Sequence, residues 1–183
     1  VPITAETCPQ YVLWDEGLLE GFNTLAKVNP PLRTPDDVQA MRQAVRQGVI
    51  DCLVTDHAPH AGHEKDVPFM AAPNGISGLE TALSLTWGLV AQNELDAADW
   101  IRLWSQAPAE VFGLPAPSAL TAGAPADFLL FDPHRQWDVS PRSLASLGKN
   151  TPCLGAALTG RVSAHFLGGR CIYDGNAPLA GSH

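Results

Sequence analysis

Helical periodicity is clearest between residues 34 and 48. Thr34 is suited to cap a helix N-terminus and Pro35 to occupy its first position, and two acidic residues follow in the first turn. Apolar side chains then recur at i, i+3, i+6 and i+7, the spacing of one buried helical face: Val38, Met41, Ala44 and Val45. We therefore expect a helix from Pro35 to about Gln47, ended by Gly48.

Short apolar runs alternate with helical patterns over the first 115 residues or so. Ile3–Cys8 and Ile50–Thr55 are expected to be strands, and the second has the continuous apolar character of a buried parallel strand. About twenty residues rich in His, Gly and Pro follow, a loop length that is uncommon unless the loop is functional or disordered. Helical segments are expected at these places: Tyr11–Glu20 as a short helix or turn, Ser77–Val90, and Ala97–Phe112 with an interruption near Pro108.

The pattern changes after Pro115. The expected elements there are β-strands separated by glycine and proline turns: Ala126–Asp132, Arg161–Leu167 and Arg170–Tyr173. The pair Gly168-Gly169 predicts a tight hairpin between the last two. We therefore expect two units, with residues 1–115 in βα style and residues 116–183 forming a small β-rich domain.

Composition and charge narrow the class of protein. Of the 183 residues, 45% are hydrophobic and 16% are charged, which is usual for a globular protein. The net charge of -8 argues against nucleic-acid binding. No apolar run approaches the roughly 20 residues that span a bilayer, and the first residues do not resemble a signal peptide. The four cysteines never form C-x-x-C, so we expect buried free thiols and a cytoplasmic protein.

Candidate chemistry centres on the stretch V-T-D-H-A-P-H-A-G-H-E-K, residues 54–65. Asp56 directly follows the expected strand, and working residues of β/α barrels lie where strands end. A carboxylate there can ligate a divalent metal or take a proton during hydrolysis, although it could equally cap a turn. Histidines at positions 57, 60 and 63 have helical spacing, but Pro59 and Gly62 interrupt any helix. A polar loop with one useful histidine is therefore favoured over a histidine-only zinc site.

Two further segments could bind a ligand. Asn29 lies in K-V-N-P-P-L-R, where the prolines fix an extended backbone, so its amide could bind a carbonyl or carboxylate or simply stabilise a turn. Asn74-Gly75 precedes a predicted helix, where backbone N–H groups could meet an anion or only form a turn. The sequence has no Ser-His-Asp ordering, no P-loop and no G-x-G-x-x-G.

Several of these motifs together resemble dihydroorotase of the long, bacterial-type class, in the amidohydrolase superfamily. The residues that carry the resemblance are V-T-D-H-A-P-H with E-K, K-V-N-P-P-L-R, A-P-N-G-I-S-G-L-E-T-A, L-T-A-G-A-P-A-D-F-L-L-F-D-P, K-N-T-P-C-L-G and G-R-V-S-A-H-F-L-G-G-R. The resemblance runs in family order along essentially the whole chain. It implies zinc-dependent, reversible cyclisation of N-carbamoyl-L-aspartate to L-dihydroorotate in pyrimidine synthesis.

The resemblance also implies roles for individual residues. Asp56 matches the aspartate that shuttles the proton and ligates metal, whereas Asn29 and His60 match substrate-binding positions. Asn74 and Gly75 match a pair whose backbone holds the substrate, and the family often has Phe where Asn74 stands. His57 is not carried over as a ligand, and His63 matches no family position.

The family's H-x-H pair, bridging carboxylate and other histidine ligands have no counterpart in this sequence. Since a β/α barrel takes about 250 residues, residues 1–115 would supply three or four βα units. We therefore expect an α/β fold, the C-terminal part of a (β/α)8 barrel plus a small β unit, inactive without the N-terminal barrel half. Alternatives are another cyclic amidase, hydantoinase-like or allantoinase-like, and a non-catalytic scaffold for aspartate carbamoyltransferase. Expected partners are the small-molecule substrate, the missing half, and a second copy or aspartate carbamoyltransferase, but neither nucleic acid nor membrane.

Overall fold

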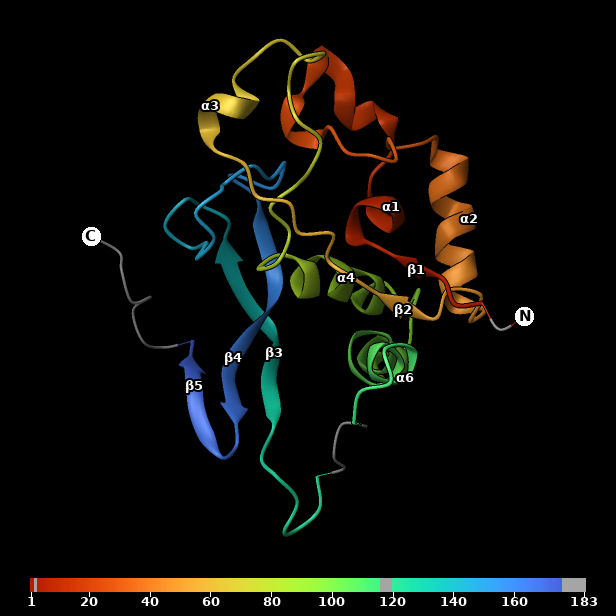
Figure 1. The fold of residues 1–183 in the computed structure, drawn as a ribbon, viewed down its shortest axis with the longest axis vertical. Coiled ribbons are helices and arrows are strands. Elements are labelled where there is room, and N and C mark those ends of the chain that lie inside the picture. Colours follow the sequence, from red (N-terminus) through yellow and green to blue (C-terminus); the bar gives the residue numbers. More distant parts are fainter. Residues whose placement is uncertain (2, 116–119, 176–183) are drawn as a thin grey trace.

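The computed structural model describes residues 1, 3–115 and 120–175. Two parallel strands and a group of short helices are followed by a three-stranded antiparallel sheet (Figure 1). The α-helices are α1 (Pro9–Leu13), α2 (Pro35–Arg46), α3 (Gly62–Lys65), α4 (Ala82–Ala91), α5 (Ala97–Ile101) and α6 (Ala107–Val111). The 3-10 helices are η1 (Glu16–Phe22) and η2 (Thr24–Ala26), and η3 (Arg102–Gln106) is a π-helical turn. The strands are β1 (Glu6–Thr7), β2 (Cys52–Leu53), β3 (Phe128–Asp138), β4 (Ala157–Leu167) and β5 (Arg170–Asp174).

Helix α2 forms where the sequence predicts it. The Thr34 side chain accepts a hydrogen bond from the Asp37 amide at 3.3 Å, and the Asp37 carboxylate accepts one from the Thr34 amide at 3.2 Å. This reciprocal cap satisfies two of the amides that a helix N-terminus leaves unpaired. Val38 and Val45 are buried, as the stripe predicts.

The two predicted parallel strands are present but short. Glu6 pairs with Cys52 and Thr7 with Leu53, and further hydrogen bonds join Asp51 to Ala5 and Val54 to Thr7. Within the described ranges these are the only parallel strands, fewer than the three or four expected βα units. A strand is recognised by its ladder hydrogen bonds, so an extended segment without a neighbour does not count as one.

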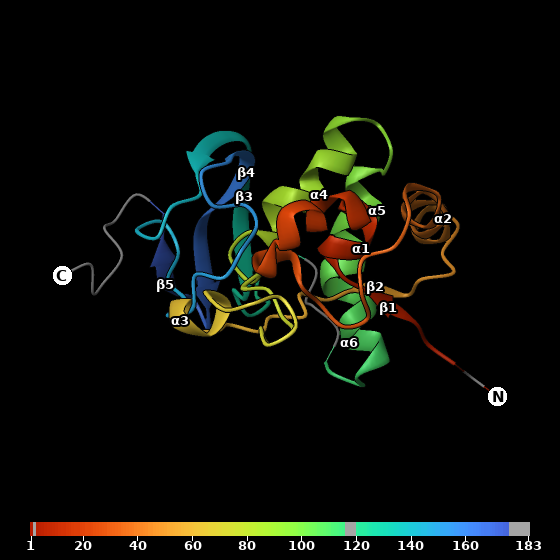
Figure 2. The same cartoon turned by 90° about the horizontal axis from the view of Figure 1, so that it is seen from above.

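Helix α4 lies at the centre of the molecule. Figure 2 shows the antiparallel sheet and α3 on one side of α4 and the helices α1, α2, α5 and α6 on the opposite side. The hydroxyl of Thr86, fully buried in α4, accepts hydrogen bonds from the indole N–H groups of Trp100 at 2.9 Å and Trp104 at 3.0 Å. On the sheet side, the Ser84 hydroxyl accepts a hydrogen bond from the Trp137 indole at 3.1 Å. Polar contacts therefore fix α4 within an otherwise apolar core.

Of the helical predictions in this region, one needs a correction and one is confirmed. The helix expected from Ser77 begins only at Ala82. The amides of Ser77 and Leu79 donate instead to the Asn150 carbonyl and to the His57 ring, so this segment is tied to loops rather than to helical partners. The interruption expected near Pro108 appears as the π-turn η3, immediately before α6. Proline lacks an N–H donor, and π-turns accommodate such breaks.

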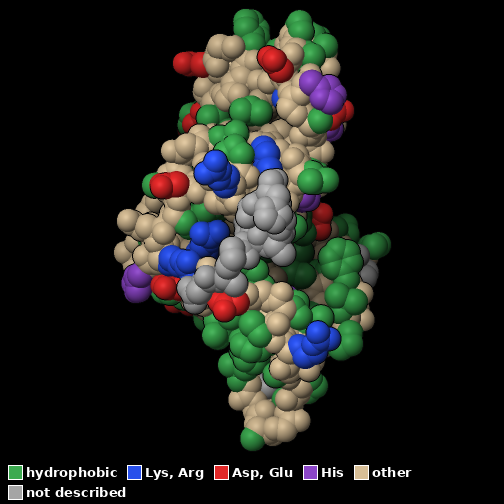
Figure 3. Space-filling view, turned by 90° about the vertical axis from the view of Figure 1, so that its left-hand side faces the viewer, with side chains coloured by type: hydrophobic (Ala, Val, Ile, Leu, Met, Phe, Trp, Pro, Cys, Tyr) green, Lys and Arg blue, Asp and Glu red, His purple; other side chains and the backbone are tan. Residues whose placement is uncertain are grey.

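The antiparallel sheet confirms the predicted strands, which are longer than expected. Gly168 and Gly169 join β4 to β5 with positive φ angles of 56° and 75°, which glycine adopts at little cost. Hydrophobic side chains gather over the sheet in the lower part of the face in Figure 3. The exposed ones in the sheet are Leu129, Leu130, Leu167 and Ile172. The predicted boundary after Pro115 adjoins residues 116–119, which lie outside the described residues.

The long loop after β2 contains the single turn α3, and hydrogen bonds from two lysines stabilise it. Lys65, only 4% exposed, donates to the carbonyls of Thr24 at 3.1 Å and Pro73 at 2.7 Å. Lys27 donates to the carbonyls of Phe69 at 2.8 Å and Ala72 at 2.7 Å. Burial, with the nearby Lys27 charge, lowers the pKa of Lys65. The loop is therefore ordered by internal hydrogen bonds.

Two smaller predictions concern thiols and membranes. All four cysteines are unpaired, as expected, and Cys8, Cys52 and Cys153 are buried. Cys171 is exposed, contrary to the expectation of burial, because it lies on β5 at the edge of the sheet. Among the described helices, none has the length and apolar character needed to cross a membrane.

Candidate active site

Asp56 lies just beyond the end of β2 in a left-handed backbone conformation, with φ 46°. Its Oδ2 accepts a hydrogen bond of 2.8 Å from Nε2 of Gln10. Gln10 is 3% exposed and stands in the first turn of α1, shortly after β1. Side chains from the exits of both parallel strands therefore meet, as in β/α folds whose sites lie at the strand ends.

Asp56 and Asn29 line one cavity of about 430 Å³. Other lining residues are Thr7, Cys8, Tyr11, Trp14 and Arg33. The Tyr11 hydroxyl donates to the Pro30 carbonyl at 2.8 Å, which ties the Asn29–Pro30 segment to α1. The structure thus brings together a candidate proton-transfer group and a candidate substrate-binding amide from segments 27 positions apart.

The electrostatic character of this cavity is negative near Asp56. Burial, followed by the Asp56 charge, raises the pKa of both Cys8 and Tyr11 to about 12. Both groups are therefore protonated at neutral pH, and the Tyr11 proton is used in the hydrogen bond to the Pro30 carbonyl. Neither can serve as a base or as a thiolate ligand there.

The residues around Asp56 fit one metal-ligand position and no more. Asp56 is exposed, and its Oδ1 has no hydrogen-bond partner among the described residues. A carboxylate with one oxygen fixed and the other open suits a divalent cation. Within those same residues, however, no three His, Cys, Asp or Glu side chains are grouped to hold a metal ion. A metal at Asp56 would need further ligands from another part of a longer protein.

The three loop histidines do not form a cage. The His57 Nδ1 accepts from the Leu79 amide at 3.1 Å, and its Nε2 lies 3.4 Å from the Ser146 hydroxyl. The His60 Nε2 lies 3.0 Å from the Asn74 carbonyl, so it must carry the proton, because a carbonyl only accepts. His63 is exposed and has no side-chain hydrogen bond to any of the residues that the structure describes.

His60, Asn74 and Gly75 form a second group beside the cavity residues. Gly75 has φ 132°, and a Cβ there would stand 2.5 Å from the Ala58 Cβ, so only glycine fits. Its N–H donates to the Lys27 carbonyl at 2.9 Å. None of the three lines the cavity of Asp56 and Asn29. The predicted site residues therefore fall into two groups, connected by residues 56–60.

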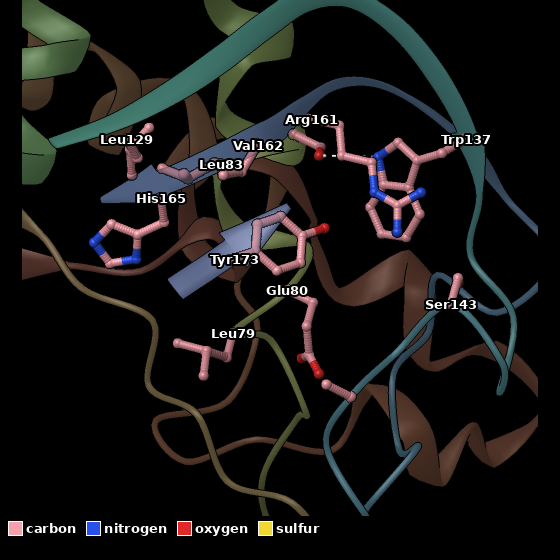
Figure 4. Close-up of a pocket in the computed structure, with 12 residues that line it drawn as sticks. Leu79, Glu80, Leu83, Leu129, Trp137, Ser143, Arg161, Val162, His165 and Tyr173 are labelled. Atoms are coloured by element: carbon pink, nitrogen blue, oxygen red, sulfur yellow. Dashed lines mark hydrogen bonds between the residues drawn. The ribbon is translucent and has the colours of Figure 1, made fainter. Parts of the chain in front are cut away.

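A second cavity, of about 350 Å³, lies between the start of α4 and the sheet. Figure 4 shows the Arg161 guanidinium over the Trp137 ring, with 4.7 Å between the guanidinium carbon and the ring centroid. Glu80 and Tyr173 also line this cavity. It contains none of the residues that the sequence predicts for the site.

The sequence did not single out two residues with close contacts at the site. Gln10 could have been found, because it follows the first predicted strand just as Asp56 follows the second. Asn150 gave no comparable signal, because it comes from a loop about 90 residues beyond the segment that it contacts.

The sequence of this chain matches that of known proteins over most of its length. A model of the amidohydrolase family matches residues 23–172. The chain is 44% identical over 175 residues to the dihydroorotase of Trichlorobacter lovleyi, covering 96% of this chain and 41% of the relative. It is also 44% identical over 174 residues to the dihydroorotase of Syntrophus aciditrophicus, covering 95% and 41%.

Solved structures agree on the fold. The L-hydantoinase (dihydropyrimidinase) of Arthrobacter aurescens superposes with a TM-score of 0.87 at 27% identity, covering 96% of this chain and 40% of that one. The D-hydantoinase (dihydropyrimidinase) of a Thermus species gives a TM-score of 0.84 at 26% identity, covering 95% and 40%. The chain thus spans about two fifths of the length of the proteins it matches. With the family match over most of its residues, it belongs to the amidohydrolase family and has the α/β fold of that family's metal-dependent hydrolases.

Proposed function

We propose that these residues are part of a zinc-dependent dihydroorotase, which interconverts N-carbamoyl-L-aspartate and L-dihydroorotate in pyrimidine synthesis. The observation that carries this proposal is the position of Asp56. It follows β2, has one oxygen bound to Gln10, and opens onto the cavity that Asn29 shares. The 44% identity to dihydroorotases supports the choice of substrate.

In the hydrolytic direction, Asp56 takes a proton from the attacking water and delivers it to the ring nitrogen as the amide bond breaks. Zinc, when bound, would activate that water and polarise the amide carbonyl. Asp56 would be one of its ligands. The Gln10 hydrogen bond holds one oxygen of this carboxylate, which lines the cavity.

Asn29 and His60 would bind the substrate. The Asn29 amide lines the same cavity as Asp56 and can donate to the substrate carboxylate. The ring of His60 is held by the Asn74 carbonyl at one nitrogen and lies 3.7 Å from Glu64 at the other.

The pair Asn74-Gly75 would contact the substrate through its backbone. The N–H and C=O of Gly75 and the C=O of Asn74 already have protein partners. The Asn74 N–H has no partner among the described residues, so we assign the substrate contact to it. Gly75 provides the backbone conformation that this turn requires.

The remaining metal ligands would come from an N-terminal barrel half, to which residues 1–115 would add the last βα units. This proposal is supported by the lack of any group of three potential metal ligands among the described residues and by a coverage of about 40% of each relative. The exposed edges of the parallel pair would then be covered by neighbouring strands. Association with a second copy or with aspartate carbamoyltransferase would involve other surfaces.

The second candidate is a hydantoinase activity, favoured by the superposition on L-hydantoinase. Substrate comparison with the full-length protein separates the two. Dihydroorotate has a carboxylate that hydantoin lacks, so we expect kcat/KM to favour dihydroorotate by at least about 100-fold. A preference for hydantoin would overturn the dihydroorotase assignment.

A further inference from the structure

The side chain of Asn150 lies where the two loops of the candidate site meet. It is 3% exposed and comes from the segment between β3 and β4, far along the chain from either loop. Its Oδ1 accepts from the His60 amide at 2.7 Å. Its Nδ2 donates to the carbonyls of Ala58 and Gly75, both at 3.0 Å.

All the hydrogen bonds of this amide therefore go to backbone groups of the loops that carry His60 and Gly75. The Asn150 carbonyl adds a fourth contact, because it accepts from the Ser77 amide at 2.9 Å. A buried amide with every donor and acceptor used has one orientation, so it fixes the distance between the loops as well as their conformations.

Other residues of the segment between β3 and β4 also lie against the loop that carries His60. A Cβ on Gly148 would stand 2.7 Å from the His60 nitrogen, so the segment passes against the loop backbone with no side chain between them. Ser146 donates to the Glu80 carboxylate through its amide at 2.6 Å and its hydroxyl at 3.1 Å. Figure 4 shows Glu80 pointing from the start of α4 toward the loop that carries Ser143.

We propose that Asn150 is a positioning residue of the active site, which sets the placement of His60 and of the Asn74-Gly75 turn relative to the substrate. This inference rests on the proposed function, since it assigns the substrate contacts to those residues. This role would make the segment between β3 and β4 a structural part of the site. Asp56 is held separately, by Gln10, so metal binding should not depend on Asn150.

The test is the Asn150→Asp substitution in the full-length protein. This change keeps the volume and the acceptor for His60, but it places carboxylate oxygen against the carbonyls of Ala58 and Gly75. We expect zinc content to be unchanged and kcat/KM to fall by about 100-fold, with KM raised, as small misplacements of binding groups cause.

Thr86→Val is the matched control. It leaves the buried indole N–H groups of Trp100 and Trp104 without their acceptor, so it should destabilise the fold through lost buried hydrogen bonds far from the loops. We expect its kcat/KM to stay within about threefold of wild type. If N150D also stays within that range, or if T86V loses as much activity, Asn150 has no positioning role.

If N150D does not fold, the Gly148→Ala variant tests whether this segment positions the loop that carries His60. It removes no hydrogen bond, but its methyl group must displace the Pro59–His60 backbone, so KM should rise. A wild-type KM for G148A would overturn the proposal. All variants are assayed on whichever cyclic amide the wild type hydrolyses. A wild type that prefers hydantoin therefore refutes the dihydroorotase assignment while the variant comparison still tests Asn150.

Discussion

Gln10 and Asp56 join the exits of the two parallel strands through a single hydrogen bond of 2.8 Å between Gln10 Nε2 and Asp56 Oδ2. Gln10 is almost fully buried, whereas Asp56 is exposed to the cavity. The bond therefore connects a rigid donor to a carboxylate whose other oxygen is free to act. Preorganisation of this kind allows a general base to work without first being ordered.

Gln10→Leu in the full-length protein tests this relationship. Without the amide donor, the Asp56 carboxylate can rotate, so we expect kcat to fall at least about tenfold with little change in KM. Steady-state kinetics with dihydroorotate as substrate measures kcat and KM of the variant. Gln43→Leu, on the exposed face of α2, is the control and should behave as wild type. An unchanged kcat for Q10L would mean that the hydrogen bond has no catalytic importance.

Asp56→Asn removes the proton-accepting group while keeping its size. We expect turnover to fall by about 10²–10⁴-fold, the usual effect of losing a general base. The exposed Asp36, in the first turn of α2, provides the control variant Asp36→Asn, which should retain full activity. A loss below about tenfold in D56N with metal content intact would exclude Asp56 from the mechanism.

His60→Ala separates substrate binding from metal binding. The ring is engaged by the Asn74 carbonyl and lies near Glu64, so we expect a higher KM or a lower kcat with zinc stoichiometry unchanged. Elemental analysis and kinetics are measured on the same preparation. His63→Ala, on the exposed side of the loop, should have neither effect. Loss of a stoichiometric metal from H60A would show that the loop is a ligand site.

Glu80→Gln tests an acid-sensitive contact between α4 and the segment after β3. Burial alone would raise the pKa of Glu80, but the hydrogen bonds from the amide and hydroxyl of Ser146, together with the Glu80 backbone amide and the nearby His57, lower it below its ordinary 4.5. A carboxylate with a depressed folded-state pKa stabilises the fold above its unfolded pKa, and this stabilisation is lost as the pH falls through the folded value.

The midpoint temperatures of thermal unfolding of wild type and E80Q should therefore differ most near neutral pH. They should converge below about pH 4.5. The control is Ser163→Ala, which removes a β4 hydroxyl that donates to the Leu130 carbonyl at 3.1 Å. This variant should show no such pH dependence. A difference between wild type and E80Q that persists unchanged in acid would contradict the assigned charge interaction.

Much of the local structure could be predicted from the sequence. The Thr34 cap and the stripe of Val38 and Val45 determine α2, because short-range hydrogen bonds and helical period act over a few residues. The Gly168-Gly169 hairpin is predicted for the same reason. The position of Asp56 after a strand also follows from local pattern, and Asp56 lines one cavity with Asn29.

The contacts that connect these elements could not be predicted. Gln10 and Asp56 are 46 residues apart, and Asn150 is 90 residues from His60. Polar side chains that bond backbone groups of distant loops leave no periodic signal in the sequence. The start of α4 was misplaced for the same reason, because long-range acceptors on Asn150 and His57 take the amides of Ser77 and Leu79.

The central claim is that this chain supplies Asp56 and the substrate-binding loops of a dihydroorotase whose other metal ligands lie in a longer protein. Zinc content and dihydroorotate turnover, measured side by side for the isolated 183 residues and for the full-length protein, test it most directly. We expect stoichiometric zinc and turnover for the full-length protein, and neither for the isolated chain, because one carboxylate cannot hold zinc against water. Stoichiometric zinc and substantial turnover by the isolated chain would contradict the claim.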